Sequence, residues 1–175
     1  RQAHTDALTG LLNKVYAEHT ISEWLREKDF EDLQALMMID MDYFKQINDT
    51  YGHATGDQVL KIFAGFLKEQ FRATDIIGRV GGDEFMILMK NVRLDYSIHL
   101  HLQKLYTNLQ NIDIPELNDQ KLSCSIGCAV APTDAESFSQ LYRLADHALY
   151  TAKHNGRGRF VIYHDIKNQQ ETVLS

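Results

Sequence analysis

The sequence has few of the residues that identify several protein classes. Only two of its 175 residues are cysteines, Cys124 and Cys128, and in a predicted strand their Cα atoms would lie about 13 Å apart, too far for a disulfide. No Cys-x-x-Cys pair occurs, and the eight histidines are scattered. We therefore predict two buried thiols, a reducing compartment and no zinc site.

Long apolar runs and an excess of basic charge are also lacking. The longest apolar run in the first half, residues 35–39, is far too short to span a membrane, and no basic-then-apolar leader opens the chain. We therefore expect no membrane contact by this segment. The net charge of −6 argues against a domain that grips nucleic acid through its phosphates.

The remaining composition is typical of a globular domain. Hydrophobic residues make up 44% and charged residues 24% of the chain, whose length suffices for one sizeable core. Because neither a repeat nor a linker divides the sequence, we predict a single domain over residues 1–175. The chain begins with Arg1 rather than Met, so we interpret it as the C-terminal part of a longer protein that also carries a sensor or an anchor.

The apolar pattern predicts both helices and strands. Helical spacing predicts helices over residues 13–27, 43–48, 59–67, 95–109 and 141–152. Runs of β-prone residues predict strands over residues 33–41, 75–80, 83–89, 122–130 and 160–163. Residues 51–56 are expected to form a loop, and those after 163 a polar tail. This irregular order favours an α+β fold, with helices packed on a mainly antiparallel sheet.

Acidic residues follow two of the predicted strands. Asp40 closes an otherwise apolar strand, while Asp83 and Glu84 lie at the Gly-Gly turn of a predicted hairpin. Side-by-side strands would gather these carboxylates at one edge of the sheet, where repulsion favours a bound cation. A few hard oxygen ligands suit Mg²⁺, which completes its shell with water and phosphates. Asp42 precedes a predicted helix, so we interpret it as an N-cap.

Cationic and amide groups near these acids suit a nucleotide. Tyr43, Phe44 and Lys45 open a short helix, where free N–H groups and a lysine favour phosphates. Lys153 and Arg157, at the end of a later helix, either bind phosphate or only complement the helix dipole.

Two further pairs of residues leave an alternative open. Asn48 and Asp57 either cap helices or bind a base edge, and an aspartate would accept from guanine but not from adenine. Arg72 and Asp75 form either a local ion pair or a second ligand site.

The motifs together resemble those of the GGDEF family, the diguanylate cyclases. Residues 81–85 spell Gly-Gly-Asp-Glu-Phe, and residues 6–13, 40–49, 125–127 and 145–153 resemble the other motifs of the family. The resemblance runs from Asp6 to Phe160. Gly158 is a departure, because many relatives have asparagine at this position.

The resemblance implies a fold, a reaction and a metal. The fold is α+β and palm-like, related to nucleotide cyclases and polymerase palms. The reaction joins two GTP molecules into cyclic di-GMP and releases pyrophosphate. Asp40, the Met41 carbonyl and Asp83 would hold Mg²⁺, with Mn²⁺ a possible substitute. Glu84 would complete the metal site or take the proton of the ribose 3′-hydroxyl, and the choice between Asp83 and Glu84 as the base stays open.

The resemblance also implies substrate contacts and regulation. Guanine would be bound by Asn48 and Asp57, and His53 would lie near the nucleotide. The phosphates would be held by the N–H groups of Tyr43 and Phe44 and by Lys45, Lys153 and Arg157. Catalysis would need a homodimer, because each domain binds one GTP. Arg72 and Asp75 stand where the family has its inhibitory product site.

The resemblance places this domain in bacterial-type signalling, in the cytoplasm. The parent protein would be either soluble or anchored in a membrane. Alternative functions are a non-catalytic cyclic di-GMP receptor and a palm-type enzyme that uses another nucleotide, such as ATP.

Overall fold

The computed structural model describes residues 3–27, 31–93 and 97–174 and is built around a six-stranded sheet of order β1-β3-β4-β2-β5-β6. The central strand, β2 (Leu33–Met41), pairs antiparallel with β4 (Glu84–Val92) and with β5 (Cys124–Ala131). The hairpin β3 (Ile76–Gly81) to β4 is antiparallel too. At the edges, β1 (Leu12–Asn13) and β6 (Phe160–Ile162) pair in parallel. The predicted α+β class with a mainly antiparallel sheet is confirmed.

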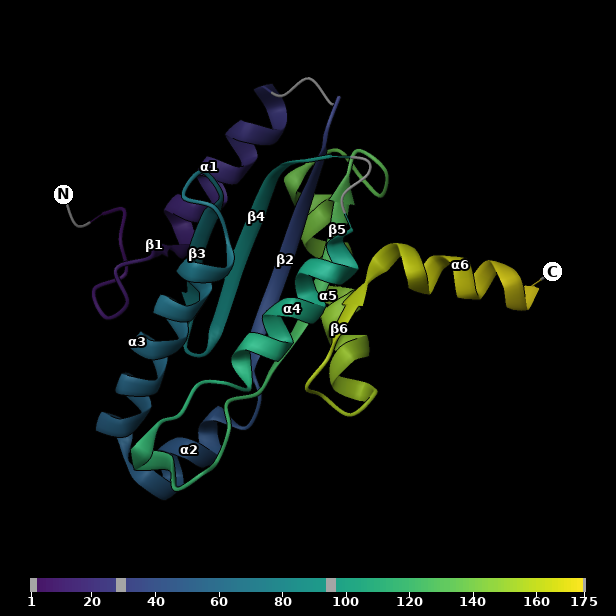
Figure 1. Cartoon of the computed structure of the whole chain (residues 1–175). Helices are drawn as coiled ribbons and strands as arrows, with labels where there is room; N and C mark the ends of the chain where they lie inside the picture. The colour runs from purple at the N-terminus through teal and green to yellow at the C-terminus, as the bar shows by residue number, and fades with distance from the viewer. Residues whose placement is uncertain (1–2, 28–30, 94–96, 175) are drawn as a thin grey trace.

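Helices cover both faces of this sheet (Figure 1). One face packs against α3 (His53–Gln70) and α4 (Ile98–Leu109), and the other against α1 (Lys14–Glu27) and α5 (Phe138–His154). The short α2 (Phe44–Tyr51) follows β2, and the helical turn η1 (Pro115–Leu117) precedes β5.

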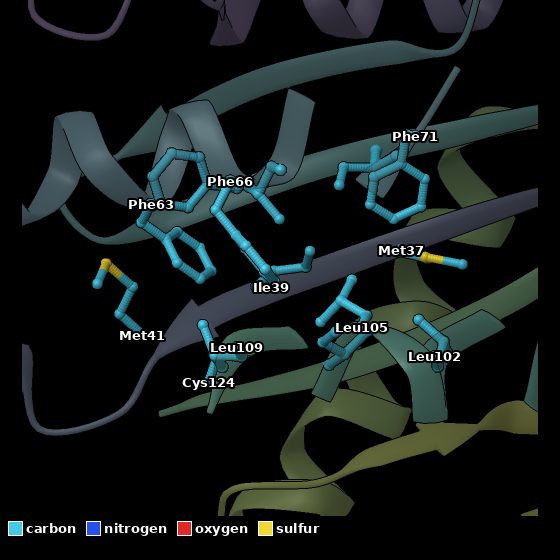
Figure 2. Packing of buried hydrophobic residues seen from close by; sticks show 14 of the residues in the cluster. Met37, Ile39, Met41, Phe63, Phe66, Phe71, Leu102, Leu105, Leu109 and Cys124 are labelled. Carbon is cyan, nitrogen blue, oxygen red and sulfur yellow. The ribbon is translucent and has the colours of Figure 1, made fainter. Parts of the chain in front are cut away.

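The alternation of side chains along β2 divides the core into two layers. Met37, Ile39 and Met41 pack with the aromatic side chains of α3 and the leucines of α4, as Figure 2 shows. Leu36 and Met38 point to the other face and pack with α1 and α5. The next residue in that second series is Asp40, so its carboxylate emerges on the α5 side of the sheet.

The structure corrects two predicted segments. Residues 51–56 are not a loop, because α2 continues to Tyr51 and α3 already begins at His53. Only Gly52 separates the two helices, and its φ of 92° turns the chain without further residues. The predicted polar tail is helical, α6 (Tyr163–Leu174), and Tyr163 packs against the α1 and α5 cluster. The predicted helix start at Asp95 lies outside the described residues.

Two local predictions, a helix cap and a pair of buried thiols, are confirmed. Asn13 caps α1, since its Oδ1 accepts a 2.9 Å hydrogen bond from the Tyr16 amide. Cys124 and Cys128 are buried free thiols, and burial raises the pKa of Cys124 to about 12. In the described part of the chain, no helix is both long and apolar enough to cross a membrane.

Candidate functional site

The register of the sheet brings the predicted acids together at the end of β2. Asp40 stands opposite Glu84 of β4 on one side and Ser125 of β5 on the other. The Met41 amide donates a 3.1 Å hydrogen bond to the carbonyl of Asp83, which ties the hairpin turn to the end of β2. Strand pairing therefore brings these acidic residues together at one edge of the sheet, as the sequence predicted.

The negative charge at this edge is only partly balanced. Asp40 is 8% exposed; its Oδ2 pairs with the Lys153 ammonium, while its buried Oδ1 has no hydrogen-bond partner among the described residues. Burial, and then the neighbouring carboxylates of Asp40 and Glu84, raise the pKa of Asp83 to about 6. An unpartnered buried oxygen beside a carboxylate that resists ionisation favours a cation at this edge.

The donor set suits a metal that needs few protein ligands. Within residues 3–27, 31–93 and 97–174, no three His, Cys, Asp or Glu side chains form a ready-made metal cluster. A zinc-like cage of side chains is therefore not present there. Two or three carboxylates and a backbone carbonyl match Mg²⁺, which takes its remaining ligands from water and substrate phosphates.

The N-cap interpretation of Asp42 is wrong. Its carboxylate is 5% exposed and accepts hydrogen bonds from Ser123 Oγ at 2.5 Å, Ser125 Oγ at 2.7 Å and the Gly158 amide at 2.9 Å. Tyr43 occupies the N-cap position of α2, and its side chain makes no capping hydrogen bond to that helix. The end of β2 directs Asp42 toward β5, away from the free amides of α2.

Two basic side chains, one from the end of α5 and one from the loop after it, lie near the end of β2 and the start of α2. Tyr43 is 50% exposed with φ at 60°, and Phe44 beneath it is buried. The Arg157 guanidinium lies 5.7 Å from the centre of the Tyr43 ring. Lys153 contacts Asp40 at the edge of the sheet. Lys45 is exposed on α2.

The two predicted guanine-binding residues lie where α2 meets α3. A Cβ on Gly56 would lie 1.8 Å from Asn48 Oδ1 and 3.4 Å from Phe44 Cζ, so glycine leaves the space that the Asn48 amide fills. Asp57 is exposed on the second turn of α3, and His53 is exposed on the first. Among the described residues, no side chain caps the N-terminus of α2 or of α3. Asn48 and Asp57 are therefore not N-caps of these helices.

Arg79 supports the hairpin turn and was not singled out from the sequence. Its Nε and Nη2 donate to the Gly82 carbonyl at 3.0 and 2.8 Å, and its Nη1 lies 3.2 Å from the Asp6 carboxylate. Burial alone would raise the pKa of Asp6, but hydrogen bonds from Thr9 and Arg79 outweigh it and lower that pKa. The available sequence signal was an arginine two residues before the Gly-Gly pair.

Arg72 and Asp75 form a separate site. The Asp75 side chain is 1% exposed and accepts hydrogen bonds from the Arg72 amide at 2.9 Å and the Lys90 amide at 3.0 Å. The Arg72 guanidinium pairs with Asp75 and with the Lys90 carbonyl. A cavity of about 370 Å³ opens beside them, lined also by Arg93. Since Lys90 is six residues along β4 from Glu84, about 20 Å separates this site from the carboxylate edge.

Known proteins resemble this chain in sequence and in fold. The family model described as "Diguanylate cyclase, GGDEF domain" matches residues 3–159. The probable diguanylate cyclase DgcT of Escherichia coli is 36% identical over 171 residues, which cover 95% of this chain but 37% of that protein. The chain thus spans well under half of this curated relative.

Solved structures share the fold. The isolated GGDEF domain of TpbB from Pseudomonas aeruginosa is 33% identical, with a TM-score of 0.82 over 95% of this chain and 99% of that one. The GGDEF domain of DgcB from Caulobacter crescentus, solved in complex with c-di-GMP, is 27% identical, with a TM-score of 0.82 over 94% and 98% of the two chains. The expected palm-like architecture is confirmed.

Proposed function

Because the chain belongs to the GGDEF family of diguanylate cyclase domains, we propose that it condenses two GTP molecules into cyclic di-GMP and pyrophosphate. The observation that carries this proposal is the edge formed by Asp40, Asp83 and Glu84. There, negative charge exceeds the balance supplied by Lys153, and the start of a helix lies next to it. Such an edge suits a metal-bound triphosphate.

The proposed metal is Mg²⁺, for which Mn²⁺ could substitute. Asp40, the Met41 carbonyl and Asp83 would hold it, and Glu84 would complete the site. The unpartnered Oδ1 of Asp40 and the raised pKa of Asp83 support this assignment, because both indicate a place where positive charge is favourable. When bound, the metal would neutralise charge on the phosphates and activate the attacking hydroxyl.

The chain's own residues would bind and orient the substrate. The N–H groups of Tyr43 and Phe44, at the start of α2, would donate hydrogen bonds to phosphate oxygens, and Lys45, Lys153 and Arg157 would add positive charge. The remaining nucleotide contacts would come from Asn48, Asp57 and His53. Asp83 or Glu84 would accept the proton of the attacking 3′-hydroxyl.

The base contacts would decide which purine is used. A carboxylate at Asp57 accepts hydrogen bonds from guanine N1–H and its amino group, whereas adenine presents an acceptor there. The amide of Asn48, which lies against Gly56, would add a second base contact. We therefore expect GTP, and not ATP, to be the substrate.

The reaction requires two copies of the domain. Each would bind one GTP, and the two-fold symmetric product needs two sites facing each other, so a homodimer is the proposed active form. We further propose that the domain, in the cytoplasm, is the catalytic part of a longer signalling protein. Its relative DgcT, of which the chain spans 37%, supports this organisation.

The cavity beside Arg72 and Asp75 is the proposed site of product inhibition. An exposed guanidinium next to an apolar-walled cavity can stack on and hydrogen-bond to guanine. The same cavity also favours an alternative function, a cyclic di-GMP receptor without turnover. A DgcB domain solved with c-di-GMP supports product binding within the family.

Product analysis distinguishes these functions. Concentrated protein is incubated with Mg²⁺ and either GTP or ATP, products are identified by mass, and the oligomeric state is measured in parallel. Cyclic di-GMP from GTP alone is the expected result. Binding of cyclic di-GMP without turnover by a demonstrated dimer would favour the receptor, and a product from ATP would favour another palm-type enzyme.

A further inference from the structure

The loop after α5 has an unusual backbone that must be held in place. Gly156, Arg157 and Gly158 all have positive φ, at 114°, 63° and 58°. Arg157 has a side chain and therefore adopts this left-handed conformation at a cost. Three amides fix the loop. Gly156 N and Arg157 N donate to carbonyls at the end of α5, at 3.4 and 3.1 Å, and Gly158 N donates to Asp42 Oδ2 at 2.9 Å.

The last of these anchors, Asp42, is itself rigidly oriented. Ser123 Oγ donates to its Oδ2 and Ser125 Oγ to its Oδ1, at 2.5 and 2.7 Å. Its backbone amide also donates to the Ser123 carbonyl at 2.8 Å. Both carboxylate oxygens are thus engaged inside the protein, unlike Asp40, whose Oδ1 has no partner among the described residues. Asp42 is built to hold protein groups and not a metal.

Two consecutive residues therefore hold one loop. Asp42 binds the backbone of Gly158, and the ring of Tyr43 lies 5.7 Å from the guanidinium of Arg157. We propose that Asp42 is a positioning residue that, through the Gly158 amide, places Arg157 at the start of α2 to meet a substrate phosphate. This inference rests on the proposed function, because it assumes that GTP phosphates occupy that position.

A double-mutant cycle on substrate binding tests this proposal. The probe is 3′-deoxy-GTP with Mg²⁺, which lacks the attacking hydroxyl, and its Kd is measured by titration calorimetry. Asp42→Ala and Arg157→Ala should each weaken binding about tenfold, as expected for loss of one charge-assisted contact. The double variant should also lose only about tenfold, because the two residues act through the same contact. A hundredfold loss would overturn the proposal.

Matched variants separate positioning from general stability. Ser123→Ala with Ser125→Ala removes two hydrogen bonds to Asp42 but leaves its contact with Gly158. This variant should unfold more easily yet bind the probe within about twofold of the wild type. Asp42→Asn retains an oxygen for Gly158 and an amide for a serine hydroxyl, so it should restore binding. Amide exchange at Gly158 should be fast in Asp42→Ala and slow in Asp42→Asn.

The remaining outcomes are also distinguishable. A folded wild type that does not bind 3′-deoxy-GTP would refute the proposed function, whereas wild-type binding that is unchanged in Asp42→Ala would refute only the positioning role. If Asp42→Ala does not fold, Asp42→Thr replaces it in the cycle, because a threonine has a hydroxyl for the serines but lacks the second oxygen. A serine variant that binds as weakly as Asp42→Ala would also overturn the proposal.

Discussion

Gly127, in the middle of β5, marks the closest approach of the sheet to α5. A Cβ at this position would lie 2.1 Å from the carbonyl oxygen of Ala145 and 2.2 Å from the amide nitrogen of Leu149. Ordinary Cβ contacts begin near 3.4 Å, so Gly127→Ala requires α5 to retreat by more than 1 Å. The obstructing atoms belong to the helix backbone, and therefore no side-chain rotation can relieve the clash.

The cost of this substitution follows from the rigidity of the contact. Overpacking a core costs about 1–3 kcal/mol when side chains can adjust. Because backbone must move here, we expect Gly127→Ala to lower the free energy of unfolding by about 3 kcal/mol or more. The shift would also carry Lys153, one turn beyond Leu149, away from Asp40, so the folded variant should turn over GTP more slowly.

Urea unfolding, followed by circular dichroism, measures the effect. Gly65→Ala is the matched control, because Gly65 is exposed within α3 and a Cβ there would meet nothing within 4 Å. Replacing a helical glycine by alanine should stabilise this variant by about 0.5–1 kcal/mol. A loss of less than about 1 kcal/mol in Gly127→Ala would refute the inference that the sheet and α5 form a rigid contact.

Four further outcomes are expected. Asp83→Ala should abolish cyclic di-GMP formation without unfolding the domain, as judged by product mass and circular dichroism; retained turnover would remove Asp83 from the metal site. Gly56→Ala should raise the KM for GTP about tenfold, since its Cβ displaces the flexible Asn48 amide; an unchanged KM would refute this placement of the amide. Arg72→Ala should relieve product inhibition at unchanged initial rate, measured with added cyclic di-GMP, and undiminished inhibition would exclude the guanidinium. Folding lowers the pKa of Asp6 from 3.8, so its carboxylate stabilises the fold above that pH and loses this advantage as the pH falls through the folded pKa. Asp6→Asn should therefore be less stable than the wild type in urea at pH 7, and this difference should shrink as the pH is lowered below 3.8; a difference that does not change with pH would refute this role of the carboxylate.

Local patterns were sufficient to predict most elements of the fold. The apolar run of β2 and the Gly-Gly hairpin are encoded within a few residues, and so their strands were predicted. The helix α6 was missed because its polar sequence carries little periodicity, and it is anchored by Tyr163 through tertiary packing. β1 has two residues, too few for any alternating pattern.

The site was predictable where residue type alone restricts the chemistry. Clustered carboxylates indicated a cation, but the role of Asp42 depended on partners 81 and 83 residues away in the chain. The pairing of Lys153 with Asp40 and of Arg79 with Asp6 spans similar separations. A side chain's neighbours across such distances are set by strand register, which no local pattern contains.

The alternation of side chains along β2 also specifies the strand register that forms the site during folding. A slip of one residue in the register would turn Asp40 into the layer occupied by Phe63 and Phe66, and would move Ile39 to the opposite face. Burying a carboxylate among aromatic side chains costs more than a domain of this size can tolerate. The same strand register that buries the apolar side chains of β2 therefore also aligns Asp40 with Glu84.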